Sequence, residues 1–243
     1  MIHPFKTLFA VPLECDSCIN DVTKSLQRLP GILNVDADLV KQLVSVEGTA
    51  APSAIVSAIQ STGRDAILRG SGNPNSAAVA ILETYTPGIA DPVRGLVRMV
   101  QVSAKLTILD LTIRGLSPGT YHATVRATGD ISQGAASAGG IWEDEEVKDN
   151  EPSRGRLGTV EVGLTGVGTV LLDKPVEVWE IIGRSIVVSR YKEEGKFTKN
   201  DPDTIVGVIA RSAGVWENEK TVCSCSGKNI WDERKENVGR GMV

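Results

Sequence analysis

Histidine is scarce in this chain, which holds only His3 and His122 among its 243 residues. Imidazole groups are common ligands of catalytic zinc and copper in proteins. Two histidines so far apart in the sequence cannot assemble a site that needs several imidazoles. The sequence therefore argues against a histidine-bound zinc or copper centre.

The chain also lacks a large excess of charge of either sign, because 26 basic residues are balanced by 30 acidic ones and the formal net charge is −4. This balance offers no basic surface to a phosphate backbone or an anionic membrane. No run approaches the ~18 apolar residues of a spanning helix, and the first residues lack the features of a secretory signal. We expect a soluble cytoplasmic protein that neither binds nucleic acid nor spans a membrane.

Cysteine is rare as well, and the four residues form two tight pairs at opposite ends of the chain, Cys15 with Cys18 and Cys223 with Cys225. This is not the pattern of a secreted disulfide framework, and in a reducing compartment such pairs more often bind metal or act in redox chemistry. Thiolates bind soft metals and attack disulfides. A lone Cys-x-Cys is too short to be specific, so incidental surface thiols stay an alternative for Cys223 and Cys225.

The first 70 residues show alternating and helical apolar patterns in the order β-α-β-β-α-β, the ferredoxin-like arrangement. Cys18 falls in the first turn of the first helix, where unpaired N–H groups and the helix dipole favour the thiolate. We expect strands over 5–11, 33–39, 44–46 and 65–69, and helices over about 18–29 and 52–63.

With a Cys-x-x-Cys on the loop before the first helix, residues 5–69 resemble the heavy-metal-associated domain of copper chaperones and copper-pumping ATPases. The resemblance implies that Cys15 and Cys18 bind one Cu(I) ion in near-linear geometry at an exposed loop. Leu13 stands where the family usually has a methionine that packs the loop. This departure does not touch the implied ligands.

Two other interpretations of Cys15 and Cys18 are weaker. A thioredoxin-type redox pair also sits at a helix start, but the intervening Asp16-Ser17 and the element order do not match it. A structural zinc site needs two more ligands, and the module's only histidine, His3, precedes the first strand.

After a polar break at 70–76, rich in glycine and proline, short alternating runs follow one another with turns between them. No convincing helix interrupts them, which predicts an antiparallel sandwich or Greek-key barrel. We expect strands over 77–84, 96–102, 106–113, 120–127, 159–163, 185–189 and 205–210.

A set of motifs makes residues 77–211 resemble copper,zinc superoxide dismutases. They are Val93-Arg94-Gly95-Leu96, Gly115-Leu116-Ser117-Pro118-Gly119, Gly129-Asp130, Ser137-Ala138-Gly139, Leu157-Gly158, Ile181-Ile182-Gly183-Arg184 and Gly207-Val208-Ile209-Ala210. The resemblance also implies that the family's metal-ligand positions hold Thr124, Arg126, Ile141, Arg156 and Ser189, and that its disulfide positions hold Ala135 and Val206. Such a barrel cannot dismutate superoxide.

The resemblance implies that this barrel keeps the family's dimer interface although it lacks the metal ligands. By resemblance, Ile182, Gly183, Arg184, Val208 and Ile209 match the subunit interface, together with the loop after Gly129-Asp130. Arg184 and Arg211 could also receive a partner's carboxylate or carbonyl groups. The alternative is that these residues only keep the barrel folded.

Together the three parts resemble the copper chaperones for superoxide dismutase, of the fungal type. We expect a heavy-metal-associated domain over 1–70, an inactive barrel over 71–217 and a short flexible tail with Cys-x-Cys over 218–243. The resemblance implies a metallochaperone that docks on immature copper,zinc superoxide dismutase as a heterodimer.

In this family's route, Cys15 and Cys18 acquire Cu(I), and Cys223 and Cys225 act at the client's copper site and disulfide by thiolate exchange. The resemblance thus makes Cys223 and Cys225 candidate copper ligands as well as disulfide-exchange thiols, and the sequence leaves open which of the two roles the tail has, or whether it has both. A homodimer of the chain stays open, as does the mitochondrial intermembrane space as a second compartment. A thiol-disulfide oxidoreductase and a cytosolic Cu(I) buffer without a client are the alternative functions.

Overall fold

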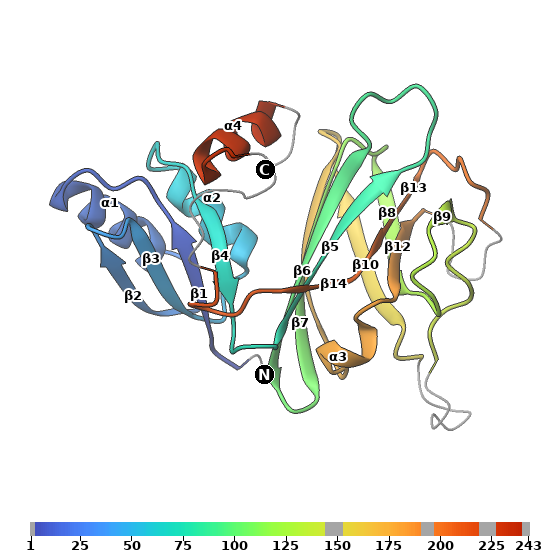
Figure 1. Cartoon of the computed structure of the whole chain (residues 1–243), viewed down its shortest axis with the longest axis horizontal. Helices are drawn as coiled ribbons and strands as arrows, with labels where there is room; N and C mark the ends of the chain where they lie inside the picture. Colours follow the sequence, from blue (N-terminus) through green and yellow to red (C-terminus); the bar gives the residue numbers. More distant parts are fainter. Residues whose placement is uncertain (1–2, 144–152, 191–196, 219–226, 240–243) are drawn as a thin grey trace. The chain divides into compact units, whose positions relative to one another are not determined.

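The computed structural model describes residues 3–143, 153–190, 197–218 and 227–239. They form two compact units (Figure 1). The N-terminal unit holds residues 4–74 together with the described residues from 213 on, and the barrel unit holds His3 and residues 75–212. The barrel unit thus ends earlier than the limit at residue 217 that we expect from the sequence.

The N-terminal unit is built on the expected β-α-β-β-α-β order, with an antiparallel sheet in the strand order β2-β3-β1-β4. This confirms the ferredoxin-like arrangement. Its elements are β1 Phe5–Ala10, α1 Asp16–Gln27, β2 Ile32–Asp38, β3 Leu43–Gly48, α2 Pro52–Gln60 and β4 Ile67–Ser71.

Both helices cover one face of this sheet. Val22 and Leu26 of α1 are fully buried against Phe9 of β1 and Val44 of β3, and Ile55 of α2 joins the same cluster. Strand residues alternate between faces, so Leu8 and Ala10 point to the opposite side. They are nevertheless buried, at 2% and 5% exposed.

The described residues from 213 on belong to the N-terminal unit. Residues 213–218, here called the stem, are hydrogen-bonded to the end of β4, and residues 230–239 form helix α4 (Ile230–Gly239). We expect a flexible tail from the sequence, and α4 is a departure from that expectation. Asn229 caps this helix, because its Oδ1 accepts the N–H groups of Trp231 and Asp232, both at 2.9 Å.

The barrel unit is an antiparallel, nearly closed β-barrel in the strand order β10-β8-β12-β13-β5-β6-β7-β11, with β14 paired to β5. The predicted barrel is therefore confirmed. Its elements are β5 Ala77–Thr84, β6 Val93–Ser103, β7 Leu106–Arg114, β8 Gly119–Val125, β9 Ser132–Ala135, β10 Arg156–Val162, β11 Val167–Lys174, α3 Val178–Ile181, β12 Ser185–Ser189, β13 Thr204–Val208 and β14 Ala210–Ser212.

Strands β9 and β11 and the short helix α3 are absent from the sequence prediction. β11 pairs with β7 along its whole length. The barrel core is apolar, with Leu82, Leu109, Tyr121, Val125 and Ile186 fully buried within it. No helix in the described parts of the chain has the length and apolar character needed to cross a membrane.

Candidate functional site

Cys15 and Cys18 lie together where the first loop meets α1. Cys15 occupies the N-cap position in an extended conformation, and the N–H of Cys18 donates to the Cys15 carbonyl at 3.0 Å. The two Sγ atoms are 3.5 Å apart, and both thiols are free. Cys15 is exposed, whereas Cys18 is 8% exposed. Because α1 begins at Asp16, Cys18 lies in its first turn, as expected from the sequence.

The surroundings of Cys18 favour its ionised form. Hydrogen bonds from the Glu14 backbone, the Arg64 side chain and Cys15 lower the pKa of the Cys18 thiol from 9.0 to about 7, against the opposing effect of burial. A thiol with this pKa is substantially ionised at neutral pH. The thiolate is the form that binds a soft metal or attacks a disulfide.

Arg64 is a site residue that the sequence reasoning missed. It lowers the pKa of the Cys18 thiol, its guanidinium group lies 3.5 Å from Asp21 Oδ2, and its Nη1 donates to the Thr62 carbonyl at 3.0 Å. A signal was present in the topology, because Ala10 at the end of β1 pairs with Ile67 at the start of β4. The loop after β1 and the loop before β4 must therefore lie at the same edge of the sheet.

Chemically, the thiol pair offers two sulfur ligands. Among the described residues, no three His, Cys, Asp or Glu side chains gather into a group that could hold a metal. A closed four-ligand zinc site is therefore not formed at Cys15 and Cys18 by the described residues. Two neighbouring thiolates suit a soft metal ion.

The second predicted thiol pair, Cys223 and Cys225, lies outside the described residues. By sequence the pair stands between the stem and α4. The stem and α4 both belong to the N-terminal unit, the unit that carries Cys15 and Cys18.

The barrel positions that lack metal ligands lie close together on paired strands. Thr124 is opposite both Val187 and Arg156, and Arg126 forms a bridge with Ile141. The hydroxyl of Thr124 donates to the Val187 carbonyl, and the Ser189 hydroxyl lies 2.8 Å from that of Thr204. These buried hydroxyls have partners within the protein.

Arg126 occupies this region as a buried cation, only 4% exposed. Its guanidinium carbon lies 4.8 Å from the centroid of the Phe197 ring. Burial, with a smaller contribution from the charge of Arg156, lowers the pKa of Arg126 to about 10, so the group stays cationic at neutral pH. A fixed positive charge opposes the binding of a metal cation at this place.

Ala135 and Val206, at the family's disulfide positions, fall in one apolar cluster with Ala138 and Val187. Apolar packing between these side chains therefore stands where the resemblance places the family's disulfide bond. The correspondence of these two residues to the family's disulfide stays a prediction from the resemblance.

The three segments expected to form a docking face are brought together in the barrel. The N–H of Gly183 donates to the Ile209 carbonyl at 2.9 Å, and the N–H of Ile209 donates to the Arg184 carbonyl at 2.8 Å. A side chain at Gly129 would collide with the Gly183 carbonyl, which shows how closely the third segment packs there. Ile182 is half-buried beside the barrel core.

The side chains at this face differ in what they can offer a partner. Val208 is 37% exposed, whereas Ile209 is 1% exposed and belongs to the core. Ile81 on β5 is 52% exposed and its carbonyl abuts Gly207, so it lies next to Val208. The sequence reasoning missed Ile81, because the alternation along β5 does not show that this exposed side chain lies next to Val208. Arg211 is exposed and donates to Asn75 Oδ1 at 2.7 Å.

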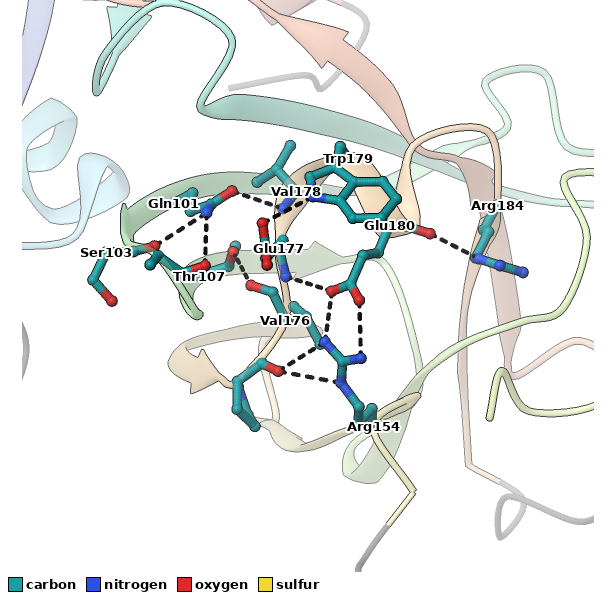
Figure 2. A network of polar contacts seen from close by, with 12 residues as sticks. Gln101, Ser103, Thr107, Arg154, Val176, Glu177, Val178, Trp179, Glu180 and Arg184 are labelled. Carbon is teal, nitrogen blue, oxygen red and sulfur yellow. Dashed lines mark hydrogen bonds and ion pairs between the residues drawn. The ribbon is translucent and has the colours of Figure 1, made fainter. Parts of the chain in front are cut away.

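Arg184 is held by the barrel itself. Its Nε donates to the Glu180 carbonyl at 2.9 Å and its Nη1 to the Ala127 carbonyl at 2.7 Å, and its guanidinium carbon lies 5.0 Å from the Trp142 ring centroid. Figure 2 shows the surrounding network, in which Arg154 makes two hydrogen bonds to the Glu180 carboxylate. Arg184 therefore has a structural role in addition to any contact with a partner.

Comparison with known proteins agrees with these features. Residues 7–65 match the heavy-metal-associated domain, and residues 93–211 match copper/zinc superoxide dismutase. The protein "superoxide dismutase 1 copper chaperone" of Debaryomyces hansenii is 46% identical over 100% of this chain and 99% of its own length. The chain belongs to the superoxide dismutase copper chaperones.

Two further relatives carry the same name. The chaperone of Kluyveromyces lactis is 46% identical over 97% of this chain and 95% of its own length, and that of Saccharomyces cerevisiae is 41% identical over 98% and 97%. As a member of this family the chain is a metallochaperone rather than an enzyme, and copper is its cargo.

Proposed function

We propose that this superoxide dismutase copper chaperone carries copper as Cu(I) on Cys15 and Cys18 and delivers it to a docked, immature copper,zinc superoxide dismutase. One observation carries the proposal, namely two free thiols 3.5 Å apart, of which Cys18 has a pKa of about 7. Sulfur ligands select the monovalent form of copper. The exposure of Cys15 leaves the ion open to attack by a client's ligands.

The barrel supplies the docking face. An isologous dimer contact can be reused with one partner replaced when the two folds are alike. Val208 and its neighbour Ile81 present exposed apolar surface, and Gly183 and the loop after Gly129 complete the face. The client bound there forms a heterodimer with the chaperone. Docking then raises the local concentration of the chaperone's thiols at the client.

The tail pair acts on the client's cysteines. We assign to Cys223 and Cys225 a disulfide that exchanges with the client's two thiols. A two-electron oxidant such as dioxygen forms this disulfide beforehand, taking two electrons and two protons from the tail thiols to give hydrogen peroxide. One client thiolate attacks the tail disulfide, and the second client thiolate then displaces the tail thiolate. The client is oxidised to its disulfide and the tail pair is reduced to two thiols, so the electrons balance between the two proteins. A cytoplasmic location is proposed on the cysteine pattern, since four cysteines in two tight pairs do not form a secreted disulfide framework.

Activation of the client tests this function. The Cu(I)-loaded chain is mixed with metal-free, disulfide-reduced superoxide dismutase, and complex formation, dismutase activity and client disulfide are followed over time. We expect Cys15→Ser/Cys18→Ser to lose copper delivery. We expect Cys223→Ser/Cys225→Ser to lose activation while the complex with the client still forms.

Other results would select the alternatives. Turnover on unrelated disulfides without copper would identify a thiol-disulfide oxidoreductase. Copper binding with no complex would identify a copper buffer. Full activation by the Cys223→Ser/Cys225→Ser variant would remove the tail pair from the mechanism.

A further inference from the structure

The stem is firmly attached to the N-terminal unit. The N–H of Ser71 donates to the Ala213 carbonyl at 3.2 Å, and the N–H of Val215 donates to the Gly72 carbonyl at 3.0 Å. The buried guanidinium group of Arg69 donates through Nε and Nη2 to the Asn218 carbonyl, at 3.1 and 2.7 Å. Main-chain and charged hydrogen bonds together fix this segment beside β4.

Helix α4 is packed more loosely against the same unit. A pocket of about 520 Å³ opens between the helix-free face of the sheet and the C-terminal segment. Its walls include Leu8 and Ala10 of β1, Trp216 of the stem, and Ile230 and Trp231 at the start of α4. Well-packed interiors leave few voids larger than a water molecule, so this contact is far from close-packed. A helix held in this way can detach at modest cost.

One specific polar contact joins α4 to the loop before β4. Arg234 Nε lies 3.2 and 3.1 Å from Asp65 Oδ1 and Oδ2, and Arg234 Nη2 lies 3.2 Å from Oδ1. The Arg234 side chain is 13% exposed and that of Asp65 is 34% exposed. Burial alone would raise the pKa of Asp65, but the hydrogen bonds from Arg234, Gln60 and the Ala66 N–H lower it overall. The carboxylate is therefore ionised and paired at neutral pH.

Asp65 adjoins the residue that reaches the thiol pair. Its Oδ1 also accepts from the Ala66 N–H at 2.8 Å and from Gln60 Nε2 at 3.2 Å, so it ties the end of α2 to the start of β4. The preceding residue is Arg64, whose guanidinium group lies 3.5 Å from Asp21 Oδ2 on α1, the helix that carries Cys18, and lowers the pKa of the Cys18 thiol. The path from α4 to the thiols thus runs through Arg234, Asp65 and Arg64.

We propose that docking of α4 on Asp65 positions Arg64 against Cys18, so that attachment of the C-terminal helix strengthens the hold of the thiol pair on Cu(I). The proposal rests on the proposed function of Cys15 and Cys18 as copper ligands. A two-thiolate Cu(I) complex is anionic, and the nearby guanidinium group stabilises it. Detachment of α4 frees the loop at Asp65, loosens Arg64 and eases the release of copper. Asp65 and Arg234 are then positioning residues.

Linkage makes the coupling reciprocal, because helix docking and copper binding must favour each other by the same factor. A partly exposed ion pair of this kind sets a coupling of about two- to fivefold. Copper loading should therefore slow amide hydrogen exchange in residues 228–239 of the wild-type chain by about that factor.

The experiment measures Cu(I) affinity of the full-length chain by competition with a chromophoric Cu(I) chelator, with no client present. The variants are Arg234→Glu and Asp65→Asn, and Lys235→Glu is the matched control. Lys235 is exposed and adjacent in the sequence, so its reversal makes the same charge change on α4 without touching Asp65. Hydrogen exchange of residues 228–239 reports docking in each variant, with and without copper.

Asp65→Asn separates positioning from simple electrostatics. Removal of a negative charge near an anionic complex would tighten copper binding through space, whereas loss of helix docking weakens it. We expect the Kd for Cu(I) to rise about two- to fivefold in Arg234→Glu and Asp65→Asn and to stay at the wild-type value in Lys235→Glu.

Cu(I) binding by Asp65→Asn that equals or exceeds wild-type affinity would overturn the coupling. An amide hydrogen-exchange rate in α4 that is the same with and without copper would also overturn it. Failure of the wild-type chain to bind Cu(I) would instead overturn the proposed function. The two failures are therefore distinguishable in one set of titrations.

Discussion

At the scale of single residues, the thiol of Cys18 owes its acidity to what surrounds it. The Glu14 backbone is the largest cause of the lowered pKa and the Arg64 guanidinium group is the next. Both act by hydrogen bonding to the ionised sulfur. Of these two contributions, only that of Arg64 can be removed by a side-chain substitution.

Replacing Arg64 by Gln should raise the pKa of Cys18 from about 7 toward its ordinary value of 9.0. The sign follows because the cation stabilises only the charged form of the thiol. The thiolate population at neutral pH then falls, and loss of copper on acidification begins at a higher pH than in the wild type. The rate of Cys18 alkylation in copper-free protein, measured against pH by peptide mass spectrometry, gives the pKa directly.

Arg28→Gln provides the matched control for that experiment. Arg28 is exposed at the C-cap of α1, at the end of the helix opposite the thiol pair. Its removal should leave the alkylation curve of Cys18 in place. Superimposable curves for wild type and Arg64→Gln would contradict the role assigned to Arg64.

The residues at the barrel's lost metal positions predict that this unit takes up no zinc. Thr124 and Ser189 offer hydroxyls that already have hydrogen-bond partners, and Arg126 brings a positive charge. A chain with all four cysteines replaced by serine, dialysed against zinc and washed, should retain no stoichiometric zinc by elemental analysis. One zinc ion per chain would show that the barrel has kept a metal site.

At the scale of elements, helix α3 depends on Glu180. This carboxylate receives two hydrogen bonds from Arg154, at 2.9 and 2.5 Å, and one from the Glu177 N–H at 2.7 Å (Figure 2). The Arg154 and Glu180 side chains are 20% and 16% exposed. The pair therefore anchors the segment that leads into Ile182, Gly183 and Arg184.

Glu180→Ala should lower the free energy of unfolding of the barrel by about 1–3 kcal/mol, because it leaves a mostly buried guanidinium group without its carboxylate. Urea unfolding followed by near-UV circular dichroism measures the change. Glu161→Ala, which removes an exposed carboxylate from β10, is the control and should change stability little. Equal stability of the two variants would show that the α3 network contributes nothing.

The docking face can be tested without disturbing the barrel fold. Ile81 is 52% exposed, so Ile81→Asp keeps the fold but places a charge in the proposed contact. Affinity for metal-free, reduced superoxide dismutase should fall on the order of tenfold or more, as measured by calorimetry. Leu164→Asp introduces the same charge at a side chain that is 95% exposed, and it should bind like the wild type.

Arg184→Glu is a poorer probe of docking than the sequence suggests. Its bonds to the Ala127 and Glu180 carbonyls would be lost, so the barrel itself should weaken. Reduced complex formation by that variant would mix a stability effect with a contact effect. Ile81→Asp avoids this ambiguity.

Periodicity explains which elements could be predicted from the sequence. The stripe of Val22 and Leu26 and the alternation around Phe9 report burial on one face, which fixes the order of the N-terminal unit. β11 was missed because its residues are mostly half-exposed and show no clean alternation. α4 was missed because its three apolar residues, Ile230, Trp231 and Val238, are too few to form a continuous helical stripe.

The same reasoning applies to the candidate site. The Cys-x-x-Cys spacing and the helix start were enough to place Cys15 and Cys18 together, because both features are local. Arg64 and Asp65 could not be placed from local pattern, since their roles depend on which strands pair. The sequence did offer local signals of α4, namely the capping residue Asn229 and the acidic Asp232 and Glu233 in the first turn.

At the scale of the whole molecule, the proposed function assigns copper handling and client recognition to different units. The N-terminal unit contains the thiol pair, and the described C-terminal segment packs with it. The barrel unit carries the proposed docking face, and its described residues form no group of metal-ligating side chains. The proposed function therefore predicts that copper passes by direct ligand exchange between sulfur atoms and the client's ligands, without a free ion in solution.

Copper transfer in the presence of a Cu(I) chelator tests that claim most directly. The Cu(I)-loaded chain is mixed with metal-free, reduced superoxide dismutase and an excess of chelator, and copper in the separated client is measured with its activity. We predict copper in the client and active enzyme with the wild-type chain, and copper on the chelator with Ile81→Asp. A client that stays empty with the wild-type chain, or fills equally with Ile81→Asp, would contradict transfer by docking.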